Sequence, residues 1–327
     1  FNMRILITGG CGFIGSNFIR FMLKENSGVR ITNLDKLTYC GNRENLKDIE
    51  NDERYRFVKG DICDQAAVKE VMAGQDAVVN FAAESHVDRS IKYPDDFLMT
   101  NIKGVRVLLD AAREAGIKKF IQIGSDEVYG SVEEGFSKEA DVLRPNSPYS
   151  STKAAGDLLA LSYYTTYGLP IIVTRSSNNF GPFQYPEKVV PLFITNLIED
   201  KKVPLYGDGG NVRDWLFVED NCSALNVILE KGVPGEIYNV GGGTHIANIE
   251  LTERLLKLTG RSGSSICPVN DRPGHDRRYA LDSSKTENLG WSRKMDFDTA
   301  LKYTVDWYKK NDIWWKPLKE KAEIVTW

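Results

Sequence analysis

Cysteine and histidine are scarce in this chain, and long apolar runs are missing. Its 327 residues include five cysteines and three histidines. The cysteines are scattered, without a Cys-x-x-Cys pair, so we expect neither a disulfide framework nor a metal site. No apolar stretch reaches the roughly 20 residues of a transmembrane helix, and no signal peptide precedes the first strand-like run. These absences predict a cytoplasmic protein.

A marked excess of charge of one sign is also missing. The chain has 42 lysines and arginines against 45 aspartates and glutamates, a formal net charge of −3. A general nucleic-acid binder would show a basic excess, so this class is not expected. With 42% hydrophobic residues, the chain can bury a full globular core.

Strand-like and helical stretches alternate through the first half of the chain. The apolar strand-like runs lie at 3–10, 30–35, 55–61, 76–83, 118–125 and 170–177, and the amphipathic stretches at 16–25, 65–72, 101–115 and 150–167. This alternation predicts a Rossmann-type α/β fold with a doubly wound parallel sheet. We expect this domain to cover residues 1–175, and further strand-like runs at 214–220 and 236–242 indicate that segments near 209–240 return to it. Residues 176–327, rich in proline and glycine loops, are expected to form mainly a smaller mixed α/β substrate domain.

The first strand-like run ends in a glycine turn. In ILITGGCGFIGSNF, Gly9, Gly12 and Gly15 follow one another at three-residue spacing before a helical stretch. Such a turn lets the backbone approach a pyrophosphate at a helix N-terminus. Asp35 ends the next strand, 20 residues beyond Gly15, where an acid can bind the ribose hydroxyls. An acid repels a 2′-phosphate, so the pattern favours NAD over NADP.

Two weaker signals follow the third and fourth strands. Asp61 and Ile62 lie where an adenine is expected, and Phe81, Ala82 and Ala83 would let the cofactor approach closely. A plain turn and simple packing explain these residues equally well without the glycine turn.

The stretch SPYSSTKAAGD places Tyr149 and Lys153 four residues apart, on one face of a predicted helix. A lysine beside a phenol lowers the pKa of the phenol, so Tyr149 could exchange a proton with a sugar hydroxyl. Ser125, at the end of an earlier strand, could donate to the same oxygen. By itself this spacing is more often a plain helix face; behind a dinucleotide turn it favours catalysis.

Two acids, Asp126 and Glu127, directly follow Ser125. Neighbours in a strand point to opposite faces, so both carboxyls reach one site only if the chain turns after Ser125. If they share a pocket, their pKa values move apart and upward, which suits one acid and one base. The alternative is an exposed loop with two solvated acids.

Long motifs across the chain resemble the extended short-chain dehydrogenase/reductase family, and more closely its dTDP-glucose 4,6-dehydratases. They are TGGCGFIGSNF, DKLTYCGN, AAESHVDRSI, SDEVYG, SPYSSTKAAGD, SSNNFGPFQYPEKVVPLFI, PLYGDGGNVRDWLFVED and DRPGHDRRYALD. The resemblance implies a lyase with tightly bound NAD, which converts dTDP-D-glucose to dTDP-4-keto-6-deoxy-D-glucose. Ser125 stands where the family usually has threonine; its hydroxyl is kept.

The resemblance also implies roles for the catalytic residues. Tyr149 takes the proton of the sugar O4 while hydride leaves C4, with help from Ser125 and Lys153. Glu127 then removes the C5 proton that the 4-ketone acidifies. Asp126 protonates the leaving C6 hydroxyl, and the hydride returns to C6.

Binding residues follow from the same comparison. Those implied for NAD are Gly9, Gly12, Phe13, Ile14, Gly15, Asp35, Lys36, Leu37, Thr38, Asp61, Ile62, Phe81, Ala82, Ala83, Ser85, Thr100, Tyr149, Lys153 and Asn179. Those implied for the nucleotide sugar are Ser85, Ser125, Asn178, Lys188, Val189, Pro191, Leu192, Phe193, Pro204, Tyr206, Arg213, Asn248, Arg272 and His275. For His86 we favour a structural role.

Several alternatives stay open. A C4 epimerase would share the cofactor and the Tyr149–Lys153 pair, but would not need the two acids. A non-catalytic NAD-dependent sensor would need neither the two acids nor the Tyr149–Lys153 pair. UDP-, CDP- or GDP-sugars could replace the thymidine nucleotide, and the pathway served could be rhamnose or another deoxysugar. Relatives dimerise through helices matching 101–115 and 150–167, so we expect a homodimer, with no nucleic-acid or membrane partner.

Overall fold

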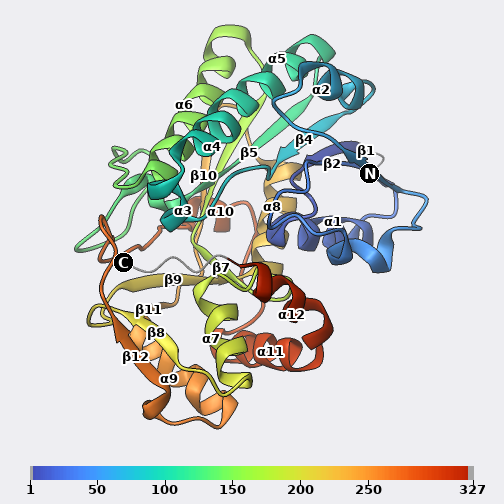
Figure 1. Cartoon of the computed structure of the whole chain (residues 1–327). Helices are drawn as coiled ribbons and strands as arrows, with labels where there is room; N and C mark the ends of the chain where they lie inside the picture. Colours follow the sequence, from blue (N-terminus) through green and yellow to red (C-terminus); the bar gives the residue numbers. More distant parts are fainter. Residues whose placement is uncertain (1–2, 323–327) are drawn as a thin grey trace.

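A computed structural model describes residues 3–322 of the chain. Figure 1 shows an α/β part built around one central sheet and, beside it, a smaller part that contains most of the last third of the chain. The expected fold class is confirmed.

The main sheet is parallel, and among the described residues it has seven strands in the order β10-β6-β5-β4-β1-β2-β3. Its strands are β1 (Met3–Thr8), β2 (Val29–Asp35), β3 (Tyr55–Lys59), β4 (Ala77–Asn80), β5 (Lys119–Ser125), β6 (Ile171–Ser176) and β10 (Ile237–Val240). The central strands are buried on both faces, which explains their nearly continuous apolar sequences.

Helices cover both faces of the main sheet (Figure 1). On one face lie α1 (Phe13–Glu25) and α8 (Val218–Lys231), and on the other α2 (Gln65–Met72), α5 (Val105–Ala115) and α6 (Pro148–Tyr167). Shorter segments connect them: η1 (Arg43–Ile49), α3 (Val87–Lys92), α4 (Pro94–Leu98), η2 (Met99–Gly104) and η3 (Asp126–Tyr129). The helix expected at 101–115 therefore begins as the π-helical segment η2, which continues directly from α4.

Two smaller sheets lie beside the main one. Among the described residues, β7 (Asn178–Phe180), β9 (Val212–Phe217) and β11 (His245–Ala247) form one, and β8 (Val203–Tyr206) and β12 (Ile266–Val269) form the other. The surrounding helices are α7 (Val189–Ile198), α9 (Asn248–Thr259), η4 (Gly263–Ser265), α10 (Ser284–Glu287), α11 (Phe297–Lys310) and α12 (Asp312–Lys321).

The two late strand-like runs end in different sheets. Residues 236–242 supply β10, which pairs with β6 at the edge of the main sheet. Residues 214–220 instead supply β9, which pairs with β7 and β11 and leads into α8. Both runs are apolar, and only the course of the chain between them decides which sheet each joins.

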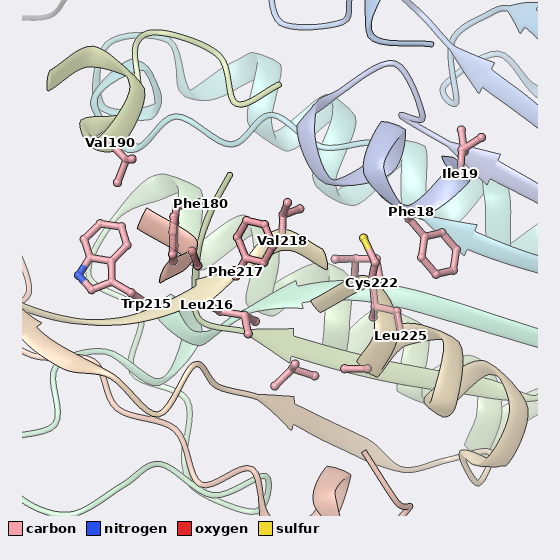
Figure 2. Packing of buried hydrophobic residues seen from close by; sticks show 14 of the residues in the cluster. Phe18, Ile19, Phe180, Val190, Trp215, Leu216, Phe217, Val218, Cys222 and Leu225 are labelled. Atoms are coloured by element: carbon pink, nitrogen blue, oxygen red, sulfur yellow. The ribbon is translucent and has the colours of Figure 1, made fainter. Parts of the chain in front are cut away.

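One apolar core runs from the main sheet into the smaller part. Figure 2 shows Phe18 and Ile19 of α1 near Cys222 and Leu225 of α8, with Trp215, Leu216 and Phe217 of β9 continuing the cluster. Helix α8 follows β9 directly in the chain and packs against α1. It therefore links the smaller part to the main sheet through one continuous apolar core.

The described residues include no helix long and apolar enough to cross a membrane.

Of the three C-terminal tryptophans, Trp314 and Trp315 lie in α12, and Trp327 lies outside the described residues. The Trp315 side chain is fully buried, and its indole nitrogen donates to the Tyr308 carbonyl at 2.8 Å. The Trp314 indole donates to Asn45 at 2.9 Å. This helix therefore packs onto the body of the protein.

Replacing Trp315 with alanine should lower the free energy of unfolding by about 3–5 kcal/mol, because it empties a fully buried site and removes a hydrogen bond. Urea unfolding followed by fluorescence measures the change. Ile313→Ala, two residues away and 87% exposed, should change stability by less than about 0.5 kcal/mol. Equal effects of the two substitutions would contradict this account of α12.

Candidate active site

A deep cleft opens at the carboxyl ends of β1, β2, β4 and β5, where ligands bind in open α/β sheets. The space between its walls, part of which is open to solvent, is about 1250 Å³. The glycine turn, Tyr149 and Lys153 all line this cleft. The structure thus brings the dinucleotide motif and the tyrosine–lysine pair into one site.

The glycine turn fits tightly against neighbouring backbone. Gly9 has a φ of +68°, and a Cβ atom there would lie 2.6 Å from the Ala82 nitrogen. A Cβ atom at Gly15 would lie 2.5 Å from the Gly9 carbonyl oxygen. Both positions therefore require glycine, and the turn presents bare backbone at the start of α1, as a pyrophosphate needs.

Asp35 braces this turn from the end of β2. Its two carboxylate oxygens accept hydrogen bonds from the backbone nitrogens of Cys11 and Leu37, each at 2.8 Å. Burial raises the pKa of Asp35, and these two hydrogen bonds oppose the rise. Lys36 pairs with Asp61 at 2.8 Å, so the acids after β2 and β3 lie at the same edge of the cleft.

Most residues expected to hold the dinucleotide line this cleft. They are Gly9, Gly12, Phe13, Ile14, Gly15, Asp35, Lys36, Thr38, Asp61, Ile62, Phe81, Ala82, Ala83, Ser85, Thr100, Tyr149 and Lys153. Leu37 and Asn179 do not line it; Leu37 has a φ of +57°, and the Asn179 amide donates to the Ser177 carbonyl. The bare glycine turn and the acid of Asp35 fit NAD.

Other residues line the cleft that sequence reasoning did not select. Tyr39 donates a 2.8 Å hydrogen bond to Glu187, which joins the loop after β2 to the loop before α7. Burial raises the pKa of Glu187. Tyr185 packs edge-on against Tyr39. The sequence indicated this contact only weakly. Both loops belong to motifs that resemble the family, DKLTYCGN and SSNNFGPFQYPEKVVPLFI, but neither motif indicates that the two loops meet.

Helix α6 holds Tyr149 and Lys153 in its first two turns. Its start is fixed by Pro148 and by a reciprocal capping arrangement between Ser147 and Ser150. Burial, followed by the charge of Glu127, raises the pKa of Tyr149, and a hydrogen bond with Ser125 opposes this. The Lys153 ammonium donates to the Ile123 carbonyl at 2.5 Å, and burial lowers its pKa. The sequence predicted that Lys153 would lower the pKa of Tyr149. In this arrangement burial outweighs that effect, and the pKa of Tyr149 is raised.

The chain turns directly after Ser125, as two adjacent acids facing one site require. Strand β5 ends there, and residues 126–129 form the short 3₁₀ helix η3. The Ser125 hydroxyl accepts from the Glu127 nitrogen and donates to Asp126, both at 3.3 Å. Asp126 is only 4% exposed. The stretch is thus a capped helical turn and not a solvated loop.

The two carboxyls differ in their surroundings. Burial raises the pKa of Asp126 well above its ordinary value, and the charges of Glu127 and Asp214 add to the rise. Burial also raises the pKa of Glu127, but the cations of Arg272, Arg213 and Lys188 oppose it. Asp126 is therefore the carboxyl that holds a proton more firmly.

The expected substrate cations surround this acid pair. Lys188 donates to the Ser85 carbonyl at 2.8 Å, and Arg213 donates to the Asp276 carbonyl at 3.0 Å. Arg272 lies 3.6 Å from Asp88, with both side chains largely buried. Arg213 lies on β9, Lys188 at the start of α7 and Arg272 in a later loop, and their charges all act on Glu127. Three cations that approach one place from separate segments suit a diphosphate.

The remaining substrate candidates divide into two groups. Tyr206 and His275 stack edge-on, with ring centres 6.1 Å apart, and His275 contacts Asp271 at 2.5 Å. Among the described residues, the side-chain carbonyl oxygens of Asn178 and Asn248 are buried without a hydrogen-bond partner, as groups awaiting a ligand would be.

The second group consists of apolar residues. Val189, Pro191, Leu192 and Phe193 belong to the first turns of α7, and Leu192 and Phe193 also belong to the apolar core. Pro204 lies on β8.

Two groups near Glu127 were missed by sequence reasoning. Asp276 and Tyr279, joined by a 2.5 Å hydrogen bond, both influence the Glu127 environment, and the Arg213 guanidinium lies 4.4 Å from the Tyr279 ring centre.

His86 caps α3 by accepting from the Arg89 nitrogen, and burial lowers its pKa to about 2. Among the described residues, no group of three or more His, Cys, Asp or Glu side chains could hold a metal ion.

A doubly wound sheet with a dinucleotide turn and a Tyr-x-x-x-Lys helix defines an extended short-chain dehydrogenase/reductase. Residues 6–304 match the family described as GDP-mannose 4,6 dehydratase, and the chain belongs to this family of nucleotide-sugar dehydratases.

Named relatives give a closer comparison. A dTDP-glucose 4,6-dehydratase of Streptomyces niveus is 51% identical over 98% of this chain and 97% of its own. The crystal structure of DesIV, a dTDP-glucose 4,6-dehydratase of Streptomyces venezuelae with NAD and TYD bound, superposes with a TM-score of 0.95 at 47% identity, covering 97% of this chain and 100% of that one. The resemblance inferred from the motifs is thereby confirmed.

An epimerase also shares the fold. The UDP-glucose 4-epimerase of Thermus thermophilus, in complex with NAD, has a TM-score of 0.87 at 31% identity, covering 94% of this chain and 100% of that one. The fold alone therefore does not distinguish a dehydratase from an epimerase. The feature that can distinguish them is the acid pair, Asp126 and Glu127.

The pKa of Asp126 predicts a pH-dependent stability. A carboxyl whose pKa is raised by folding stabilises the fold below its unfolded pKa and loses that contribution as the pH rises through its folded pKa. Asp126→Asn, which cannot ionise, should match the wild type near pH 3 and be more stable at pH 8, by about 1.4 kcal/mol for each unit of the shift that lies below pH 8.

Urea unfolding at the two pH values measures this difference. Glu50→Gln, at an exposed position, serves as the control and should show no gain at pH 8. A pH-independent difference between Asp126→Asn and the wild type would show that Asp126 ionises as freely in the folded protein as in the unfolded one.

Proposed function

We propose that this protein is an NAD-dependent lyase that converts dTDP-D-glucose to dTDP-4-keto-6-deoxy-D-glucose and water. The observation that carries the proposal is the acid pair of η3, which lies beside the Tyr149–Lys153 pair in one buried site. The named dehydratase relatives, similar over nearly the whole chain, support it.

The cofactor, when bound, accepts a hydride from C4 of the sugar and returns it to C6. Tyr149 accepts the proton of the O4 hydroxyl, and Ser125, which shares a hydrogen bond with Tyr149, holds the same oxygen. Lys153 lies four residues further along α6, where its ammonium can hold the nicotinamide ribose. This is the oxidation half of the reaction.

Elimination is assigned to the acid pair. The 4-ketone acidifies the C5 proton, and Glu127 removes it. Asp126 gives its proton to the C6 hydroxyl, which leaves as water. When the hydride enters C6, C5 takes back a proton from Glu127, so the net change is the loss of one water. The cations around Glu127 favour a carboxylate there, while the buried position of Asp126 favours the protonated form. One acid and one base thus follow from the surroundings of two adjacent residues.

The nucleotide sugar is proposed to lie between η3 and the smaller part. Arg213, Arg272 and Lys188 would hold the diphosphate, and Asn178 and Asn248 would use their buried side-chain oxygens toward the ligand. Residues 1–175 then form the NAD-binding domain, and residues 176–327 form mainly the domain for the nucleotide sugar. The remaining residues proposed for binding are those given above for each ligand.

Product mass tests the activity directly. With dTDP-glucose and no added reductant, the product should lack one water, and UDP-glucose should react more slowly. A product of unchanged mass with galactose configuration would make the protein an epimerase. No turnover of either sugar would contradict both activities.

Glu127→Gln should slow the loss of water by roughly 10²–10⁴-fold, because the base for the C5 proton is removed. Oxidation at C4 should continue, so a 4-keto sugar that retains its C6 hydroxyl should be found by mass spectrometry after borodeuteride reduction. Glu134→Gln, at an exposed position in the same segment, is the matched control and should behave as the wild type. Undiminished loss of water in Glu127→Gln would remove Glu127 from the mechanism.

We also propose a homodimer in the cytoplasm that serves deoxysugar synthesis, such as that of rhamnose. The outer surface of α6 supports the dimer, because Leu158 is 57% exposed and Tyr164 and Tyr167 are exposed on the same helix. Exposed apolar side chains on one helix suit an interface between copies.

Light scattering during size-exclusion chromatography should give the mass of a dimer for the wild type. Leu158→Glu should shift the protein toward the monomer, because it would bury a charge in the interface. Val233→Glu, equally apolar and exposed but outside α6, should leave the dimer intact. A monomeric wild type would contradict the proposal.

A further inference from the structure

A buried polar network lies behind the end of β5 and has no part in the reaction steps above. Its centre is Arg175 on β6, which is 1% exposed. The Arg175 Nε donates to Asp157 at 3.0 Å, and its Nη1 donates to the Tyr129 hydroxyl at 2.9 Å. The Asp157 side chain is fully buried.

The two partners of Arg175 belong to the two halves of the catalytic site. Asp157 lies on α6, four residues after Lys153, and therefore on the same face of that helix. Tyr129 is the last residue of η3, the short helix that carries Asp126 and Glu127. One guanidinium thus joins the helix of the tyrosine–lysine pair to the helix of the acid pair.

Each end of the network is held in place. The Tyr129 hydroxyl donates to the Asn239 side chain of β10 at 2.9 Å, and that side chain donates to the Ser137 carbonyl at 3.1 Å. At the other end, a Cβ atom on Gly124 would lie 2.9 Å from the Asp157 carboxylate. The carboxylate therefore occupies space that only glycine leaves open beneath the end of β5.

Stability alone is a weak reason for such a network. Removing an ion pair from water costs free energy that its attraction often fails to repay, and apolar residues of similar volume are often at least as stable. A planar guanidinium that donates to two partners in fixed directions does, however, fix geometry. That property matters here because η3 is only four residues long and makes few hydrogen bonds of its own.

We propose that Arg175 is a positioning residue which, through Asp157 and Tyr129, holds the acid pair of η3 in register with the tyrosine–lysine pair of α6. The inference rests on the proposed function, since it assigns elimination to the residues of η3. Helix α6 spans 20 residues with caps at both ends, so it keeps its place without the network. Loss of the network therefore disturbs elimination and spares oxidation.

Tyr129→Phe tests this with the least disturbance, because it keeps the ring and removes only the hydroxyl. The rate of water loss should fall roughly tenfold, the effect of losing one hydrogen bond to a charged group, while KM and the rate of C4 oxidation stay unchanged. The 4-keto sugar that retains its C6 hydroxyl should accumulate. Arg175→Lys should act in the same direction, because a single ammonium does not bridge both partners in the geometry of the fork.

Tyr238→Phe is the matched control. Tyr238 is another buried tyrosine, on β10 next to Asn239, and its hydroxyl accepts from the Val233 nitrogen away from η3. This variant should show wild-type rates of both steps. Equal slowing of oxidation and elimination in Tyr129→Phe, or no slowing of either, would overturn the proposal.

Amide hydrogen exchange of the NAD-loaded protein gives a readout that does not depend on turnover. In Tyr129→Phe, the amides of residues 126–130 should exchange faster, while those of α6 keep their wild-type protection. Unchanged exchange at 126–130 would overturn the positioning role. If the wild type fails to dehydrate any nucleotide sugar, the proposed function is wrong, and the exchange measurement still decides the role of the network.

Discussion

The turn of the chain directly after β5 is the constraint on which the rest of the active site depends. A strand continued by one more residue would send Asp126 and Glu127 to opposite faces of the sheet. Ser125 prevents this, because its hydroxyl accepts from the Glu127 nitrogen and starts η3. Two carboxyls then enter one poorly solvated site, at the cost of raised pKa values for both. That cost is useful only to chemistry that needs a protonated acid beside a base.

The same turn relates the two halves of the reaction in space. The tyrosine–lysine pair lies on a long, capped helix, whereas the acid pair lies on four residues that follow a central strand. A long helix is stabilised by hydrogen bonds along its length, whereas a single helical turn depends on contacts with its neighbours. The side chain of Arg175, on β6, connects the short element to the long one.

Much of the fold and site could be predicted from local sequence. The strands β1 to β6 and the helices α2 and α6 follow apolar periodicity, and their positions agree with the stretches expected from the sequence within a few residues. The tight turn at Gly9 and Gly15 and the place of Asp35 beside it depend on local geometry, so the spacing in the sequence was sufficient to predict them. Tyr39 and Glu187 were missed because 148 residues separate them, and their hydrogen bond exists only once the loops meet. For a related reason, the sequence did not reveal which sheet β9 joins, since its apolar sequence suits either one.

The sequence by itself determined the class of fold, and it predicted the cofactor turn and the reacting groups, because each depends on residues close together in the chain. Only the tertiary structure decided how those groups ionise and how they face one another. Burial raises the pKa values of both adjacent carboxyls, and the charges of Arg272, Arg213 and Lys188, all distant in the chain, oppose the rise at Glu127. Proton affinity depends on the dielectric surroundings and on nearby charge, and both arise from packing between segments that the sequence keeps far apart.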